Sequence, residues 1–151
     1  MSLISAEDLI LEANLGKQTD PAILEPHISS AEIEAKRILG EEMYGKAESY
    51  ESSSLENEKK IFSEIKKGII YLAMSYAVHS LNIETQGSGI VQIKGWDQSR
   101  SELLSRNDVN DLSNYFRSTG ILFLQPYITE KANEGKTGSS IDTGNLYLGA
   151  L

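Results

Sequence analysis

The amino-acid sequence predicts a mainly α-helical protein: a helical bundle around one long central helix, with a short β-hairpin or extended loop and a C-terminal arm. Apolar residues recur at three- and four-residue spacing in several segments, and residues 69–81 are apolar on nearly all sides. One short stretch, residues 90–94, alternates in the manner of a strand instead. We expect residues 1–128 to form one helical domain and residues 129–151 to form a flexible arm.

The first two helices are predicted from the signals at their ends. Ser5 and Asp8 have the spacing of a capping box, which predicts a short helix over residues 6–14. Asp20 followed by Pro21 is typical of a second helix start. That helix ends at Gly40. It either runs through Pro26, or Pro26 splits off a single first turn and the longer helix begins near residue 29 or 30.

The central helix is predicted after a polar surface loop over residues 45–54, with Ser54 as its cap. Its second half, residues 69–81, has too few polar positions for a solvent-facing side. A helix of that kind must be surrounded by protein, so we expect this half to be sheathed by the other helices. His79 falls in it and is interpreted as a hydrogen-bonded core or interface histidine.

The remaining residues of the domain are predicted to form a loop and a final helix. Gly87 and Gly89 break the long helix, and the short strand that follows ends at Gly95. Another helix is predicted from Asn107 or Asp108 to Pro126. Its inner stripe is predicted to consist of Leu112, Tyr115, Phe116, Thr119, Leu122 and Phe123. Gly120 weakens this helix by about 1 kcal/mol relative to Ala.

The C-terminal arm is expected to work through contacts with other molecules. Residues 129–151 are rich in Gly, Ser, Thr and Asn, and they end in the apolar patch Leu146-Tyr147-Leu148, which an isolated arm would expose. Trp96 either packs onto the helices or anchors a partner. The predicted subunit or partner contacts are Ile90, Ile93, Trp96, Leu146, Tyr147 and Leu148.

Charge and composition exclude several classes of function. The net charge is −8, so the protein repels phosphate backbones on average, and sequence-specific nucleic-acid binding is not expected. No cysteine is present, which excludes thiolate metal sites and cysteine nucleophiles. Neither a signal peptide nor an apolar run of membrane-spanning length occurs, so we expect a soluble cytoplasmic protein without membrane contact.

No sequence motif supports catalysis. Gly135-Lys136-Thr137 lacks the earlier glycine of a phosphate-binding loop, and Asp142-Thr143-Gly144 is more simply a turn in a polar segment. The two histidines, His27 and His79, show no metal-binding spacing with carboxylates. We therefore expect no enzyme activity, no metal and no cofactor, although chemistry that uses carboxylates alone stays open.

Four lysines form two pairs one heptad apart on the long helix: Lys59, Lys60, Lys66 and Lys67. They are candidates for contact with a phosphate backbone or an acidic partner. The simpler interpretation, which we favour, is a solvated face balanced by neighbouring glutamates at salt-bridge spacing.

Three stretches together resemble the small head-to-tail connector (adaptor) proteins of tailed bacteriophages. Residues 70–84, IYLAMSYAVHSLNIE, look like the long central helix of that family, and residues 122–127, LFLQPY, are similar to its Leu-Leu-x-Pro-Tyr ending. Residues 31–40, AEIEAKRILG, resemble its preceding helix. The resemblance covers roughly residues 20–127. Ile128 replaces the usual basic residue after Pro-Tyr, and the tail is longer than the pattern needs.

The resemblance implies a role in a phage or prophage head–tail junction. It implies a homo-oligomeric ring, commonly of twelve subunits, between portal and tail proteins, within a virion assembled in the host cytoplasm. In such a ring the loop over residues 86–98 and the arm would become ordered on neighbouring subunits. The alternatives are a non-viral α-helical protein-binding or regulatory module and, third, a small enzyme that uses only carboxylates.

Overall fold

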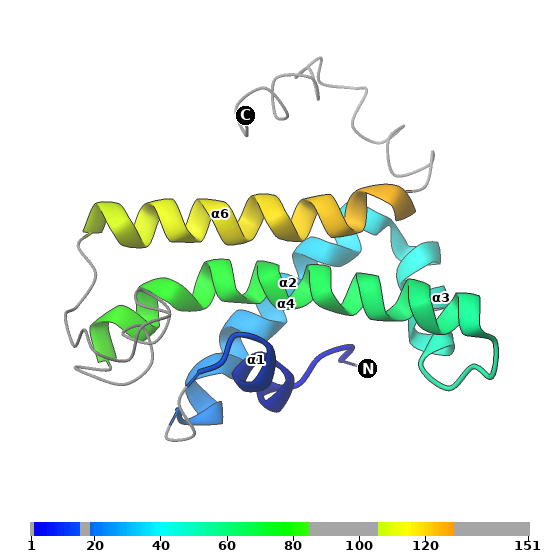
Figure 1. Ribbon diagram of the computed structural model, residues 1–151, viewed down its shortest axis with the longest axis horizontal. Coiled ribbons are helices and arrows are strands. Elements are labelled where there is room, and N and C mark those ends of the chain that lie inside the picture. The colour runs from blue at the N-terminus through cyan, green and yellow to red at the C-terminus, as the bar shows by residue number, and fades with distance from the viewer. Residues whose placement is uncertain (1, 16–18, 85–105, 129–151) are drawn as a thin grey trace, which may run out of the picture.

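The structure is a computed structural model that describes residues 2–15, 19–84 and 106–128 (Figure 1). These residues contain five α-helices and one 3-10 helix, and no strand occurs among them, so the predicted mainly α class is confirmed. The hairpin expected near residues 90–95 and the arm lie outside the described residues. The elements are α1 (Ala6–Glu12), α2 (Pro21–Leu39), α3 (Glu41–Tyr50), α4 (Glu56–Glu84), α6 (Arg106–Leu124) and the 3-10 helix η1 (Gln125–Tyr127).

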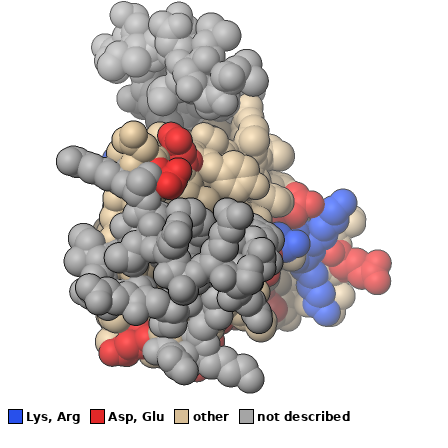
Figure 2. All heavy atoms as spheres, turned by 60° about the vertical axis from the view of Figure 1, so that its left-hand side comes forward, with Lys and Arg blue, Asp and Glu red and all other residues tan. Residues whose placement is uncertain are grey.

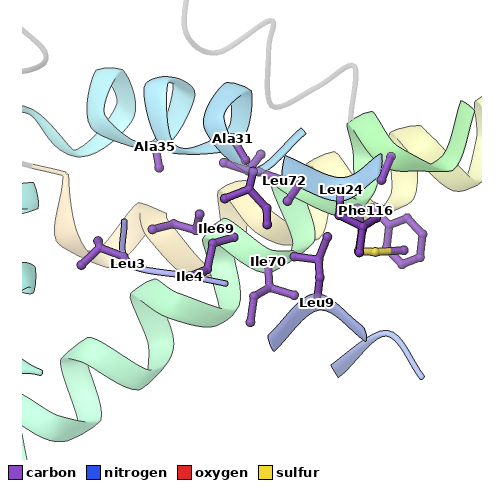
Figure 3. Packing of buried hydrophobic residues seen from close by; sticks show 14 of the residues in the cluster. Leu3, Ile4, Leu9, Leu24, Ala31, Ala35, Ile69, Ile70, Leu72 and Phe116 are labelled. Carbon is purple, nitrogen blue, oxygen red and sulfur yellow. The ribbon is translucent and has the colours of Figure 1, made fainter. Parts of the chain in front are cut away.

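Helix α4 lies at the centre of the described fold. It packs against α1, α2, α3 and α6, and most extensively against α6, which runs beside it in the opposite direction (Figure 1). Leu72, Met74 and Val78 are at most 1% exposed, as the all-round apolar sequence predicted. Figure 3 shows the core from close by, with Leu9, Leu24, Leu72 and Phe116 each contributed by a different helix.

Two glycines allow α4 and α6 to approach closely. A Cβ atom at Gly120 would lie 2.8 Å from the carbonyl oxygen of Gly68, and one at Gly68 would lie 2.7 Å from Cδ2 of Leu124. Because the first contact at Gly120 is with backbone, the crossing of the two helices requires glycine there, whereas a side chain at Gly68 would have to displace Leu124. Gly120, which the sequence marks as a weak point of its own helix, is therefore a point of close packing.

The predicted starts of the first two helices are confirmed. Ser5 and Asp8 form a capping box, and the Asp20 carboxylate accepts a hydrogen bond from the Ala22 backbone N–H at 2.9 Å. Helix α2 continues through Pro26 without a break. Proline removes one backbone hydrogen bond there, but the residues on either side of it, Leu24 and Ile28, are both buried and hold the turn in place.

The surface loop predicted over residues 45–54 is wrong for its first part, because α3 extends to Tyr50. Tyr44 and Ala47, three residues apart, are buried on one side of this short helix, which packs on α2 and α4. Gly40, at a φ of 84°, separates α2 from α3 without an intervening loop. Sequence reasoning missed α3 because so few apolar residues mark its inner side.

The cap predicted at Ser54 is wrong, because α4 begins at Glu56 and Leu55 is the residue immediately before it. The Ser53 hydroxyl, rather than that of Ser54, accepts a hydrogen bond from the Leu55 backbone N–H at 3.1 Å. It also donates to the Glu58 carboxylate in the first turn of the helix. A serine side chain therefore still orients the start of α4.

The N-terminal segment belongs to the core, which the sequence did not indicate. Leu3 and Ile4 are each 4% exposed. The Glu32 carboxylate of α2 accepts hydrogen bonds from the Leu3 backbone N–H at 2.6 Å and from the Ser2 hydroxyl at 2.7 Å. This carboxylate takes the place of the backbone partners that an extended segment at the edge of a helical fold lacks.

Candidate functional site

The predicted partner contacts in the loop and the arm are not placed by the structure. Ile90, Ile93, Trp96, Leu146, Tyr147 and Leu148 all lie outside the described residues. Their roles stay predictions, and the described surface has to be searched separately for a functional site.

The four lysines of α4 do not form one free basic stripe. Lys59, Lys60 and Lys67 are exposed, but Lys66 forms an ion pair with Asp8 of α1 at 2.9 Å. The face shown in Figure 2 carries basic and acidic side chains next to one another. A charge that already has an internal partner gains less from a nucleic-acid phosphate, so Lys66 is the weakest of the four candidates. The roles of Lys59, Lys60 and Lys67 stay predictions.

The Asp8 carboxylate joins α1 to α4. Besides the ion pair with Lys66, it accepts a hydrogen bond from the Ser5 backbone N–H at 2.9 Å. Burial acts to raise the pKa of Asp8, but the hydrogen bonds from Lys66 and Ser5 and the positive charge of Lys66 outweigh it, so the pKa lies below its ordinary value.

We expect Asp8→Asn to lower the free energy of unfolding at neutral pH by about 1 kcal/mol. Because the folded-state pKa of Asp8 is lowered, its stabilisation is complete above the unfolded-state pKa and is lost as the pH falls through the folded-state pKa. Urea unfolding should therefore show a difference in unfolding free energy between the wild-type protein and Asp8→Asn at neutral pH. This difference should disappear as the pH falls through the folded-state pKa of Asp8. Asp111→Asn, at an exposed position on α6, is the control, and a difference of constant size at all pH values would contradict the prediction.

His79 is not a core histidine, and the other half of its interpretation, a place at an interface, stays a prediction. Its side chain is exposed, although the neighbouring Val78 and Leu81 are buried. His27 lies at a half-buried position on α2. Among residues 2–15, 19–84 and 106–128, no three His, Asp or Glu side chains are grouped so that they could hold a metal ion.

Glu34 of α2 forms the principal buried polar contact between three helices. Glu34 is 8% exposed. Arg117 of α6 contacts both carboxylate oxygens, Nη2 at 2.5 Å from Oε1 and Nη1 at 3.3 Å from Oε2, and the Tyr76 hydroxyl of α4 donates to Oε2 at 2.5 Å. Burial, followed by this hydrogen bond and the glutamate charge, raises the pKa of Tyr76. Both oxygens of the Glu34 carboxylate have partners within the fold, which indicates a structural role.

The end of the described domain is fixed to α4 by a second tyrosine. The Tyr127 hydroxyl of η1 donates a hydrogen bond to the Glu64 carboxylate. Burial, the hydrogen bond and the charge of Glu64 raise the pKa of Tyr127 to about 12. The chain therefore leaves the domain beside the first half of α4.

An aromatic surface lies along one side of α6, which we call the aromatic flank. The Tyr71 ring of α4 stacks on Phe123 with centroids 5.7 Å apart and lies 6.1 Å from Phe116. On α6 itself, Tyr115 and Leu122 are 58% and 62% exposed. Arg117 extends from α6 to Glu34 of α2, whereas Phe123 of the same helix packs on Tyr71 of α4. The flank consists of Tyr71, Tyr115, Leu122 and Phe123, and the buried ring of Phe116 contacts Tyr71 and Tyr115.

The apolar stripe predicted on this helix is thus wider than the part that α4 covers. The contact line runs through Val109, Phe116, Gly120 and Leu124, which are buried. Tyr115 and Leu122 were expected to continue the inner stripe and instead face outward. The signal that could have separated the two groups is Gly120, since a small residue marks where a neighbouring helix comes closest.

None of the helices in the described segments combines the length and hydrophobicity needed to cross a bilayer. No model of a known protein family, no curated protein and no solved structure matches this chain.

Proposed function

We propose that this chain is a structural subunit of the head–tail junction of a tailed phage or prophage, where copies of it assemble into a ring that contacts portal and tail proteins. The observation that carries the proposal is the aromatic flank. Tyr115 and Leu122 expose large apolar side chains seven residues apart on one side of α6, and exposed apolar side chains that lie together are typical of a contact site for a segment of another protein. The proposal gives the chain no catalytic role, no cofactor and no membrane contact.

The three stretches that resemble phage connector proteins also support it. They fall in α2, in α4 and at the end of α6 with η1, and α4 packs against both α2 and α6. Segments far apart in the sequence thus build one connected part of the domain. The net charge of −8 fits a component past which DNA must move without binding.

The oligomeric state of the full chain tests the ring. We expect light scattering after size exclusion, and native mass spectrometry, to show a closed oligomer whose population rises with protein concentration, because each copy exposes the same flank. A strict monomer at every concentration would contradict the ring and favour the alternative, a non-viral helical module that binds one partner.

A second measurement separates the phage role from self-association in general. Co-expression with the portal and tail proteins encoded beside this gene should yield a complex that contains the ring. If the neighbouring genes encode no portal, capsid or tail proteins, the junction role fails even if the chain oligomerises.

A further inference from the structure

The exposed part of the aromatic flank has the size of a site for a short apolar peptide. Tyr115 and Leu122 are seven residues apart on α6, so they lie on one side of the helix and about 10 Å apart along its axis. A stable interface between whole domains buries about 800 Å² on each partner. Two exposed large side chains and the edges of the stacked rings beside them are far less than such an interface needs.

The chain itself carries a segment that fits this site. After Ile128 it continues for 23 residues, and the last of these include Leu146, Tyr147 and Leu148, while the preceding residues 129–145 are mostly polar. Fully extended, residues 129–145 span at most about 60 Å. Helix α6 is about 28 Å long, so the apolar segment can reach an α6 helix on its own subunit or on an adjacent one.

We propose that Leu146-Tyr147-Leu148 of one subunit packs onto Tyr115, Leu122 and Phe123 of the neighbouring subunit. The choice of the neighbour rests on the proposed function. A donor segment and a separate acceptor site on every copy make a head-to-tail contact, and contacts of that kind close into rings. A segment that bound its own subunit would cover the flank without joining any copies.

Substitutions at both ends of this contact test it in the full chain. Leu122→Ser and the pair Leu146→Ser with Leu148→Ser should each weaken self-association by about tenfold or more, because each removes apolar surface from the same contact. Leu11→Ser is the matched control, since Leu11 is 82% exposed on α1, a helix that packs on α2 and α4. Circular dichroism and thermal melting should be unchanged in all of these variants, because every substituted leucine within the described residues is exposed.

A photo-crosslinking residue at position 122 identifies the occupant. Oligomers assembled from equal amounts of nitrogen-14 and nitrogen-15 protein should give cross-linked peptides that pair position 122 of one isotope with residues 146–148 of the other. Cross-links within single isotopes alone would overturn the contact between neighbours.

Failure of this contact is distinguishable from failure of the ring. An oligomer that forms normally in the Leu122→Ser and C-terminal variants leaves the proposed ring standing and overturns the arm contact. A chain that stays monomeric at every concentration overturns both.

Discussion

Replacing Gly120 with valine should lower the free energy of unfolding by about 3 kcal/mol. The Cβ atom alone would lie 2.8 Å from the Gly68 carbonyl oxygen and 3.0 Å from Cγ of Leu72. Neither α4 nor α6 can absorb this locally, since the first contact is with backbone, so the two helices must separate along their packed length. Urea unfolding monitored by circular dichroism measures the loss, which is a large fraction of the stability of a typical domain.

Gly45 offers the matched control for this substitution. It lies within α3, and a Cβ atom there would meet nothing within 4 Å. Gly45→Ala should therefore raise the free energy of unfolding by up to about 1 kcal/mol through helix propensity, whereas Gly120→Ala should lower it. If alanine stabilises the protein equally at both positions, the helices do not cross as closely as described.

Removing the guanidinium of Arg117 should cost about 2 kcal/mol of unfolding free energy. Arg117→Met keeps the aliphatic part of the side chain but leaves the buried Glu34 carboxylate with Tyr76 as its remaining partner among these contacts. We place the loss below the range for fully buried pairs because the Arg117 side chain is 49% exposed. Denaturant unfolding at neutral pH measures it.

A double variant distinguishes a buried unpaired charge from lost packing. Glu34→Leu combined with Arg117→Met removes the charge together with its partner, so most of the stability should return. Lys46→Met breaks the exposed pair with Glu42 and should change stability little. If the double variant is as unstable as Arg117→Met alone, the loss comes from packing rather than from the unpaired carboxylate.

The helices that the sequence predicts well are those with strong local signals. Ser5, Asp8 and Asp20 define helix starts through their own hydrogen bonds, and Pro21 through its fixed φ angle, so the pattern is readable without the rest of the fold. The central position of α4 follows from its second half, which has no polar side and therefore must be surrounded by other parts of the protein. Helix α3 lacks both kinds of signal, and its formation depends on the tertiary packing of Tyr44 and Ala47.

The candidate site was harder to predict because it depends on which helix sides meet. Hydrophobic spacing placed Tyr115 and Phe116 in one stripe, but only the approach of α4 at Gly120 determines that Phe116 is buried and Tyr115 exposed. The contact of Glu34 with Arg117 joins residues 83 positions apart, and no local pattern signals such a pairing. The predicted contacts at Ile90, Trp96 and Leu146 stay predictions.

The central position of α4 has a consequence for synthesis on the ribosome. Leu9, Leu24 and Leu39 of the first two helices are fully buried, yet α4, on which both helices pack, begins only at Glu56. Translation proceeds at roughly 5–20 residues per second, so the emerging N-terminal helices wait several seconds with their apolar sides uncovered. The nascent chain therefore offers chaperones a binding surface that disappears once α6 has emerged and packed beside α4.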